Sequence, residues 1–269
     1  MADTPRILII GCGNMGGAML AGWLASGLAP QAFTVVDPML AEAPAGVTLL
    51  REVPEGDFPV VLLGVKPQAL DTVIASVEPA IGPGTVLLSI LAGVEIASLA
   101  QRFPRAGGLV RVMPNLAAAI RKSPMALYGE GLDAGQRAAV SDLAARLGQC
   151  EWLEREDLFD AVTALSGCGP AFVYRFIDAM AAAATGLGLD EAQSGRLALA
   201  TVEGAALLAA ASPHAPGELA RRVASPGGST QKGLDVLDAE AALARLMAAT
   251  LTAARDRSAE MAAEARGAG

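Results

Sequence analysis

The sequence has a single histidine, His214, and only three cysteines, Cys12, Cys150 and Cys168, among its 269 residues. One histidine excludes histidine-rich metal sites, and any histidine acid or base, as in a catalytic triad, would have to be His214. His214 lies in a proline-containing stretch typical of a surface turn, which argues against that role. The cysteines are far apart and form no CxxC or Cys/His cluster, so the sequence encodes neither a disulfide framework nor a zinc site. We therefore expect a protein without a bound metal, located in the reducing cytoplasm.

Positive charge and aromatic side chains are also scarce. The chain has 20 Lys and Arg residues against 28 Asp and Glu residues, a net charge of −8, and 4% aromatic residues. This balance argues against a nucleic-acid-binding protein, which needs a basic face to displace counterions. No signal peptide is recognisable, and the nearest candidate for a membrane span, 197–211, is short and interrupted by Glu203. We expect this stretch to be a buried helix, and the protein to bind neither nucleic acid nor a membrane.

Strand and helix signals alternate along the first half of the chain. Five short apolar runs predict strands, and the segments between them predict helices. Strands that are apolar on both faces are typical of a parallel sheet covered by helices on both sides. The segment 39–57 is weak and contains Pro44 and Pro54, so we expect a degenerate crossover there. The predicted strands are 6–10, 33–37, 58–65, 85–91 and 109–113, with edge strands at 125–128 and 150–153 and helices at 14–28, 68–77, 95–102 and 133–147.

Beyond residue 165 the strand signals stop. Hydrophobic residues make up 53% of the chain, and alanine, which loses no side-chain entropy in a helix, is abundant in this half. The sequence therefore predicts an α/β domain over residues 1–164, followed by an all-helical domain over residues 165–269. The predicted helices of the second domain are 170–185, 190–211, 218–223, 227–237 and 239–265.

The segment Gly11-Cys-Gly-Asn-Met-Gly16 follows the first predicted strand and opens a helix. In this context the first glycine permits a tight turn, the second lets a pyrophosphate approach the backbone, and the third allows close packing of helix on strand. The helix N-terminus adds unpaired N–H groups and partial positive charge. Asp37 ends the second strand, where an acidic residue can bind the adenosine ribose. These residues predict a Rossmann-type dinucleotide-binding domain; a purely structural glycine turn is the alternative.

Other segments carry a second, more ordinary interpretation with equal weight. Lys66 follows the third predicted strand and would lie near the cofactor, or it is a surface lysine before Pro67. Asn115 donates to a carboxamide or caps a turn. The segment Ser225-Pro-Gly-Gly-Ser-Thr230 places a Pro-Gly-Gly turn and two hydroxyl residues at a helix start, where exposed N–H groups could hold a small carboxylate. An ordinary turn with a helix cap is the alternative.

Together, five segments resemble the pyrroline-5-carboxylate reductase family, in the family's order and across nearly the whole chain. They are Gly-Cys-Gly-Asn-Met-Gly-Gly-Ala-Met at 11–19, Val-Lys-Pro-Gln at 65–68, Met-Pro-Asn at 113–115, Ser-Gly-Cys-Gly-Pro-Ala-Phe at 166–172 and Ser-Pro-Gly-Gly-Ser-Thr at 225–230. The resemblance implies reduction of 1-pyrroline-5-carboxylate to L-proline by NAD(P)H, the last step of proline biosynthesis. It also implies that the helical domain is a dimerisation domain, so that the protein forms a dimer or a higher homo-oligomer.

The resemblance assigns roles to individual residues. It places the pyrophosphate at Ile10, Gly11, Cys12, Gly13, Asn14 and Met15, the ribose at Asp37, and the rim of the cofactor site at Gly64, Val65, Lys66, Pro67, Ile90, Leu91 and Ala92, with Glu156 as a further cofactor contact. It places the substrate at Gly228, Ser229 and Thr230, and gives Thr230 the catalytic role, with its hydroxyl near the ring nitrogen. Two departures bear on substrate selectivity: Leu116-Ala117 stand where the family usually has Thr-Pro, and Cys168 where it usually has serine.

The scarcity of histidine agrees with imine reduction. A ketone needs an acid for its developing alkoxide, whereas a cyclic imine can arrive protonated or take a proton from water or a hydroxyl. The enzymatic alternative is a β-hydroxyacid dehydrogenase or a related imine reductase, but the lysine that hydroxyacid enzymes use is absent from 166–172. A non-catalytic nucleotide sensor would not need a carboxylate site at 225–230. We expect NADH to be preferred over NADPH, because the Asp37 carboxylate would repel a 2′-phosphate. The alternative is that Asp37 points to solvent or caps the turn that follows it.

Overall fold

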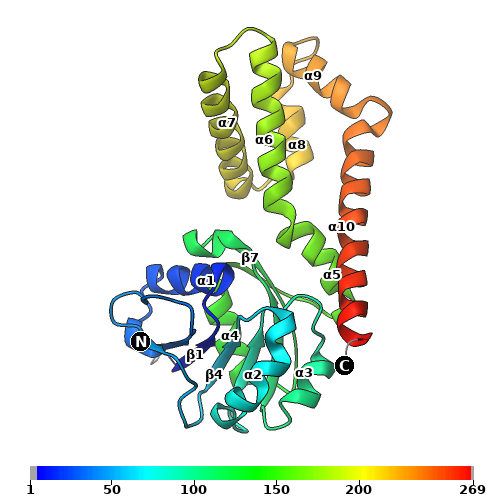
Figure 1. Cartoon of the computed structure of the whole chain (residues 1–269). Coiled ribbons are helices and arrows are strands. Elements are labelled where there is room, and N and C mark those ends of the chain that lie inside the picture. Colours follow the sequence, from blue (N-terminus) through cyan, green and yellow to red (C-terminus); the bar gives the residue numbers. More distant parts are fainter. Residues whose placement is uncertain (1–4, 268–269) are drawn as a thin grey trace. The chain divides into compact units, whose positions relative to one another are not determined.

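The computed structural model describes residues 5–267, with side chains described for residues 5–263 (Figure 1). The chain divides into two compact units. The first unit comprises Met1–Gly167 together with Ala254–Gly269, and the second unit comprises Cys168–Ala253.

The first unit is built on one eight-stranded sheet with the strand order β3-β2-β1-β4-β5-β6-β7-β8. Neighbouring strands from β3 to β6 are parallel, β7 runs antiparallel to β6, and β8 is parallel to β7. All the strands predicted from the sequence are present. The strands are β1 (Ile7–Ile10), β2 (Phe33–Val36), β3 (Thr48–Leu50), β4 (Val60–Leu63), β5 (Val86–Ser89), β6 (Gly108–Met113), β7 (Ser123–Glu130) and β8 (Gly148–Trp152).

Helices cover both faces of this sheet, as the apolar strands predict. Alternate residues of β1 point to opposite faces: one set packs in a core with α1 and α4, and the other in a second core with α2 and α3. The buried indole N–H of Trp23 in α1 donates to the carbonyl oxygen of Leu143 in α4 (2.9 Å), which joins the two helices of the first core. The helices of this unit are α1 (Asn14–Ala25), α2 (Leu70–Val77), α3 (Ile96–Arg102), α4 (Ala134–Ala145) and α5 (Phe159–Val162), with short 3-10 turns between them.

The weak segment 39–57 contains a strand that the sequence does not predict. Its three residues form β3, which pairs in parallel with β2, and no helix joins the two strands. The missing helix agrees with the degenerate crossover expected here. The strand itself is too short, and too close to Pro44 and Pro54, to give a periodic apolar signal.

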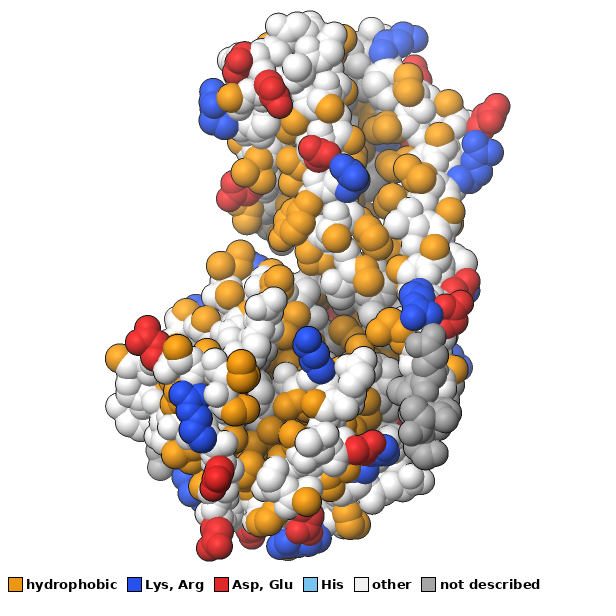
Figure 2. All heavy atoms as spheres, viewed as in Figure 1, with side chains coloured by type: hydrophobic (Ala, Val, Ile, Leu, Met, Phe, Trp, Pro, Cys, Tyr) orange, Lys and Arg blue, Asp and Glu red, His pale blue; other side chains and the backbone are white. Residues whose placement is uncertain are grey.

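The second unit is all helical, as expected. It contains α6 (Gly169–Gly186), α7 (Glu191–Ala211), α8 (Pro216–Val223), α9 (Ser229–Asp238) and the first part of α10 (Ala242–Gly267). The expectation of a buried helix over 197–211 is wrong for the single chain. Only Ser194 and Ala198 of α7 are buried, because α6 covers one side of the helix and leaves the rest exposed. Figure 2 shows hydrophobic side chains across the surface of these helices.

α7 is the one helix in the described part of the chain whose length and composition would allow it to cross a membrane. A single helix of this kind is weak evidence for a membrane protein, since core helices of ordinary proteins have the same composition.

The C-terminal turns of α10 belong to the first unit, whereas the sequence places the whole segment 165–269 in the helical domain. The Ser258 hydroxyl donates to an oxygen of Asp160 in α5 (2.7 Å). Ala262 is buried against Gly93, where an added Cβ would lie 3.2 Å from the Ala262 Cα. These contacts account for the difference at the C-terminal end. At the other boundary the units divide after Gly167, three residues beyond the expected position.

Candidate functional site

The strand order reverses at β1, which lies between β2 and β4, and the loops that follow β1 and β4 meet there. The N–H of Gly64 donates to the carbonyl oxygen of Ile10 (2.8 Å), and a Cβ on Gly64 would lie 2.5 Å from the carbonyl oxygen of Gly11. Open parallel sheets bind ligands at such a reversal, outside the carboxyl ends of the strands. The structure thus brings together the two glycine-containing loops that the sequence predicts to hold the cofactor.

The glycines of the first loop differ in what the structure requires of them. Gly11 has φ +82°, and its Cβ would lie 3.0 Å from Val65, while a Cβ on Gly16 would lie 2.8 Å from the carbonyl oxygen of Gly11. Gly13 has φ −70°, and an added Cβ would meet nothing within 4 Å. Neither packing nor backbone conformation therefore requires glycine at 13. A ligand that approached the backbone closely would require it, because a side chain at 13 would occupy the open space before α1.

The N-terminus of α1 fits the pyrophosphate of a dinucleotide. Gly13 is the N-cap residue, no side chain caps it, and the first turn contains no acidic residue. The N–H groups of Asn14 and Met15 have no partner within the helix, and the helix dipole adds partial positive charge at this end. The site therefore offers backbone donors to an anion, with no carboxylate of the first turn to repel it.

Asp37 follows β2 and is held by three backbone N–H groups. Its Oδ2 accepts from the N–H of Cys12 (2.8 Å), and its Oδ1 accepts from the N–H groups of Met39 (2.8 Å) and Leu40 (3.2 Å). The carboxylate thus caps the turn that follows β2 and also ties that turn to the glycine loop. Capping of this turn is the alternative to a ribose contact, so the ribose-binding role of Asp37 stays a prediction. Oδ2 accepts one hydrogen bond and Oδ1 accepts two, so Oδ2 keeps more capacity for a further donor.

Three of the predicted cofactor residues have buried side chains. Ile10, Cys12 and Leu91 are each less than one-tenth exposed and belong to the two cores of the sheet. Burial, with a smaller contribution from the Asp37 charge, raises the pKa of the Cys12 thiol. These residues can therefore meet a ligand only through their backbone, and the Cys12 thiol stays protonated and unreactive at neutral pH.

The remaining rim residues are more accessible. Lys66 and Ala92 are exposed, and Val65, Pro67 and Ile90 are half-buried. The Lys66 ammonium forms no hydrogen bond or ion pair with any residue that the structure describes, and Pro67 begins a 3-10 turn that leads into α2. Their contact with a cofactor stays a prediction.

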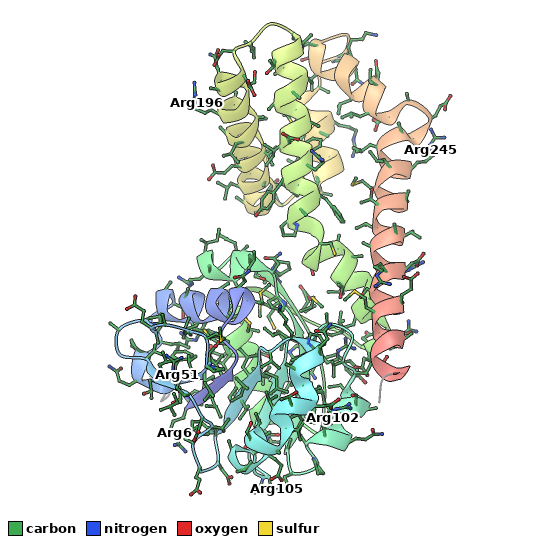
Figure 3. All side chains as sticks on the ribbon, viewed as in Figure 1. Arg6, Arg51, Arg102, Arg105, Arg196 and Arg245 are labelled. Atoms are coloured by element: carbon green, nitrogen blue, oxygen red, sulfur yellow. The ribbon has the colours of Figure 1, made fainter. Side chains whose placement is uncertain are left out.

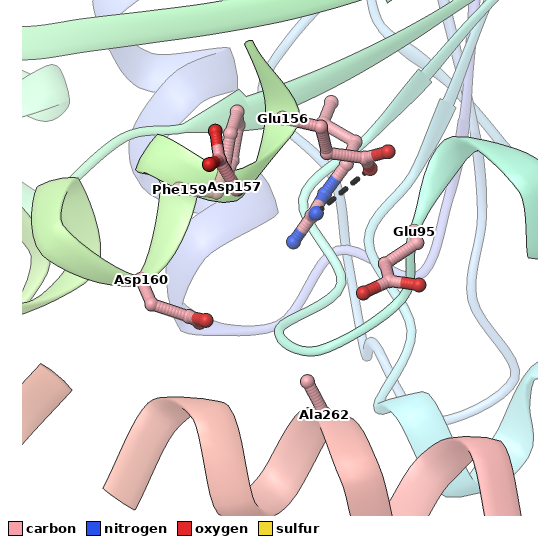
Figure 4. Close-up of a pocket in the computed structure, with 7 residues that line it drawn as sticks. Glu95, Glu156, Asp157, Phe159, Asp160 and Ala262 are labelled. Atoms are coloured by element: carbon pink, nitrogen blue, oxygen red, sulfur yellow. Dashed lines mark hydrogen bonds and ion pairs between the residues drawn. The ribbon is translucent and has the colours of Figure 1, made fainter. Parts of the chain in front are cut away.

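Glu156 has a structural role that the sequence does not reveal (Figure 4). One of its oxygens accepts from the Arg111 guanidinium (2.8 Å) and from the N–H of Ile96 at the start of α3 (2.8 Å). The Arg111 side chain is only 7% exposed and lies over the Phe159 ring, 4.2 Å from its centroid. A cavity of about 220 Å³ adjoins the pair, and it is lined by Glu95, Arg111, Glu156, Asp157, Phe159, Asp160 and Ala262.

The role of Glu156 as a cofactor contact therefore stays a prediction, beside an ion pair that is observed. Arg111 is not among the residues predicted from the sequence. Its signal was one charged residue in the middle of the apolar run 109–113. Within the described part of the chain, no group of three His, Cys, Asp or Glu side chains is arranged to hold a metal ion.

Asn115 caps a turn, which confirms one of its two interpretations. Its side-chain oxygen accepts from the N–H of Ala117 (2.9 Å), and its Nδ2 donates to the carbonyl oxygen of Ser166 (3.0 Å). Ser166 lies in a π-helical segment, η6 (Thr163–Gly167), which ends where the first unit ends. Both ends of the amide are engaged within the first unit.

The predicted substrate residues lie in the second unit, at the start of α9. Gly227 has φ +73°, the N–H of Gly228 donates to the carbonyl oxygen of Ser225 (2.9 Å), and Gly228 is the N-cap of the helix. No side chain caps this terminus, and Ser229 and Thr230 are exposed. The first turn of α9 thus has N–H groups without helical partners beside two hydroxyls, an arrangement suited to a small carboxylate.

Two family models match the chain. Residues 6–93 match the family described as NADP oxidoreductase, coenzyme F420-dependent, and residues 156–261 match the family described as pyrroline-5-carboxylate reductase dimerisation. Among curated proteins, the chain is similar to the pyrroline-5-carboxylate reductase of Pseudomonas aeruginosa, with 37% identity over 97% of this chain and 98% of that protein.

Solved structures give the same result. The chain is similar to a pyrroline-5-carboxylate reductase from Coxiella burnetii, with a TM-score of 0.87, 28% identity and coverage of 96% of this chain and 98% of that chain. It also has the fold of the Plasmodium falciparum pyrroline carboxylate reductase, whose structure has NADP bound. The TM-score is 0.81 and the identity 23%, over 97% of this chain and 99% of that chain.

Proposed function

Because this chain belongs to the pyrroline-5-carboxylate reductase family, we propose that it reduces 1-pyrroline-5-carboxylate to L-proline with NADH or NADPH, the last step of proline biosynthesis. The observation that carries the proposal is similarity over nearly the full length, which includes both the dinucleotide-binding loop and the start of α9. The geometry at Gly13 supports it independently, because the open space there fits a ligand and serves no need of the fold.

The residues of the first unit would hold the cofactor by its phosphates and ribose. The N–H groups of Asn14 and Met15 would donate to the pyrophosphate, and Asp37 would accept from the ribose. The bound nicotinamide supplies the hydride. The protein's task is then to orient two ligands, and orientation can lower a barrier by several kcal/mol without a protein acid or base.

The residues of the second unit would hold the substrate. The N–H groups at the start of α9 would bind its carboxylate, and the Thr230 hydroxyl would hydrogen-bond its ring nitrogen. The hydride adds to the carbon of the C=N bond, whose electron pair passes to nitrogen. That nitrogen arrives protonated or takes a proton from water or a hydroxyl, so no histidine is needed.

We infer that NADH is preferred over NADPH. The three hydrogen-bond partners of the Asp37 carboxylate are backbone N–H groups, and no cationic side chain of the described residues forms an ion pair with it. A 2′-phosphate carries nearly two negative charges, and repulsion at this distance costs on the order of 1–3 kcal/mol. The preference would then be roughly ten- to hundredfold in kcat/KM. The Plasmodium falciparum relative has NADP bound, which supports a nicotinamide cofactor for this chain but not this preference.

Replacing Asp37 tests the preference. Both cofactors are compared on the parent and on the Asp37→Ser variant, which removes the charge and keeps a hydroxyl acceptor. The parent should favour NADH, and the variant should shift toward NADPH. A parent that already favours NADPH, or a variant with an unmoved ratio, contradicts the role given to Asp37.

Cofactor oxidation followed at 340 nm tests the reaction itself. NADH and NADPH are each supplied with pyrroline-5-carboxylate, with a panel of 3-oxo acids, and with no substrate. Only pyrroline-5-carboxylate should be reduced. Turnover of 3-oxo acids would instead indicate a hydroxyacid dehydrogenase, and cofactor binding without turnover would indicate a nucleotide sensor.

We also propose that the protein is a homo-oligomer, a dimer or larger, in the cytoplasm. The match of 156–261 to a dimerisation family and the exposed apolar helices of the second unit support the assembly. The three cysteines are free thiols, which supports a reducing compartment.

A further inference from the structure

Arg51 lies beside Asp37 at the carboxyl edge of the sheet. Leu50 of β3 pairs with Val36 of β2 in parallel register, so Arg51 and Asp37 are the next residues along two neighbouring strands. The Nη1 of Arg51 donates to the carbonyl oxygens of Asp37 (2.7 Å) and Leu40 (2.7 Å). Figure 3 labels Arg51 on this part of the chain. The guanidinium thus sits on the same turn that the Asp37 carboxylate caps.

The rest of the guanidinium is available to a ligand. Arg51 is exposed and forms no ion pair with any described residue, so its Nε and Nη2 keep their N–H groups for another acceptor. The two carbonyl contacts restrict the orientation of the planar group. A planar guanidinium with two free donors matches the geometry of a phosphate.

Asp37 and Arg51 therefore bring opposite charges to one turn. The carboxylate points toward the glycine loop, where its Oδ2 accepts from Cys12, and the Arg51 guanidinium bonds the backbone of the turn itself. The end of the second strand is where Rossmann folds distinguish a ribose hydroxyl from a 2′-phosphate. A ribose or 2′-phosphate bound at the end of β2 would therefore lie near both the Asp37 carboxylate and the Arg51 guanidinium.

We propose that Arg51 is a specificity-determining residue for the cofactor, which binds the 2′-phosphate of NADPH and so limits the discrimination imposed by Asp37. This inference rests on the proposed use of a nicotinamide dinucleotide, and it does not depend on the identity of the substrate. In the sequence, Arg51 carries no signal, because its position relative to Asp37 depends on a strand that the sequence does not predict.

Binding of cofactor fragments tests the proposal without catalysis. Isothermal titration calorimetry at low ionic strength compares AMP with 2′,5′-ADP, which differ by the 2′-phosphate. Arg51→Met should lower the affinity for 2′,5′-ADP about tenfold, the effect of one lost charge-assisted hydrogen bond, and leave that for AMP nearly unchanged. NADPH and NADH should show the same contrast.

Two further variants separate charge from structure. Arg51→Lys keeps the positive charge, so it should retain most of the affinity for 2′,5′-ADP. Lysine cannot bridge the two carbonyl oxygens, so this variant loses the structural contacts of Arg51 while it keeps the charge. Arg105→Gln removes an exposed positive charge just before β6, at the amino ends of the parallel strands, whereas Arg51 lies at their carboxyl ends. This variant should change neither affinity. A purely structural role would weaken both ligands in Met and Lys variants alike, and this result overturns the proposal.

The failure of the proposed function gives a different result. A parent chain that binds neither AMP nor 2′,5′-ADP lacks a dinucleotide site, which removes the proposed function and this inference together. A parent that binds both, with an Arg51→Met variant that binds 2′,5′-ADP as well as the parent does, overturns the role of Arg51 alone.

Discussion

At the scale of single residues, Gly13 differs from the other glycines of its loop because the fold itself does not require it. We expect Gly13→Ala to fold with unchanged or slightly higher stability, by up to about 1 kcal/mol, because alanine restricts the unfolded chain. Affinity for NADH and NADPH should fall on the order of tenfold, because the new methyl group keeps the pyrophosphate from its backbone donors. Urea denaturation and calorimetry measure the two effects.

Gly11→Ala is the matched comparison in the same loop. Gly11 has φ +82°, and an added Cβ would lie 3.0 Å from Val65. Because alanine is strained in this conformation, the variant should lose on the order of 1–3 kcal/mol of stability. If Gly13→Ala lost as much stability as Gly11→Ala, glycine at 13 would be explained by the fold and not by a ligand.

Thr230 carries the residue-scale prediction for catalysis. Thr230→Ala removes the hydroxyl expected at the substrate nitrogen, and losing one such bond costs about 1–3 kcal/mol when its partner is left unpaired. We expect kcat/KM to fall about ten- to hundredfold while NADH affinity stays unchanged. Thr230→Ser keeps the hydroxyl and should keep most of the activity. Equal rates in the parent and Thr230→Ala would remove Thr230 from the mechanism.

The sequence predicts single residues well where the signal is local. The glycine loop and the acidic residue after β2 are both read from spacing within a short segment. The partners of these residues are not local: Asp37 accepts from Cys12 across 25 positions, and Arg111 bonds Glu156 across 45. Such contacts depend on the register of the strands, which one sequence does not supply.

At the scale of secondary-structure elements, α1 packs closely on the 3-10 segment η4 (Leu116–Ile120). A Cβ on Gly22 would clash with the carbonyl oxygen of Ala118 and would lie 2.7 Å from Leu147. Backbone cannot move aside as a flexible side chain can, so Gly22→Ala should cost at least about 2 kcal/mol of unfolding free energy. Denaturant titration measures it.

Gly17→Ala is the control in the same helix. The nearest neighbour of its Cβ would be the carbonyl oxygen of Cys12 at 3.8 Å, an ordinary contact, so we expect no loss of stability. Similar losses in the two variants would show that the helix, and not its contact with η4, sets the requirement at Gly22.

The Glu156 carboxylate, on the 3-10 turn Glu156–Leu158, accepts from both Arg111 of β6 and the N–H of Ile96 at the start of α3. Removing the carboxylate in Glu156→Ala leaves a nearly buried guanidinium without its partner. We expect a loss of about 2–3 kcal/mol, below the range for fully buried pairs because the Glu156 side chain is 24% exposed. Replacing both residues, as in Arg111→Met with Glu156→Leu, should recover part of this loss.

The exposed pair Arg105–Glu78 provides the comparison. Glu78→Ala should cost no more than about 1 kcal/mol, because exposed ion pairs contribute little. If Glu156→Ala were equally mild, the contact between Arg111 and Phe159 would be enough to hold the arginine in place.

Elements were predictable from the sequence where they are long or strongly periodic. The apolar runs identify β1, β2, β4, β5 and β6, and the two predicted edge strands correspond to β7 and β8. Only β3, which has three residues and no helix before it, is not predicted. The π-helical segment Thr163–Gly167 also escapes prediction. Its Ser166 carbonyl accepts from Asn115, 51 residues earlier, and a local pattern cannot encode such a contact.

At the scale of the whole molecule, the exposed apolar side chains of the second unit predict an obligate dimer. Leu208, on α7, is 73% exposed, and a single chain leaves such faces uncovered. Leu208→Glu should shift the mass in light scattering from an oligomer to a monomer at micromolar concentration. The first unit should still bind NADH, since its sheet and loops do not involve α7.

Met39→Glu is the control for this experiment. Met39 is 89% exposed but belongs to the first unit, so the same change there should leave the assembly intact. A parent that is stable and active as a monomer at micromolar concentration would refute the dimer prediction.

The return of α10 to the first unit also constrains the order of events during synthesis. The ribosome delivers Gly93 early and Ala262 only after the entire second unit has emerged, yet the two residues pack against each other. Nascent domains usually fold as they leave the exit tunnel, from the N-terminus onward. A stalled or truncated chain that lacks the last turns of α10 would therefore leave the loop after β5 uncovered and accessible to chaperones and proteases.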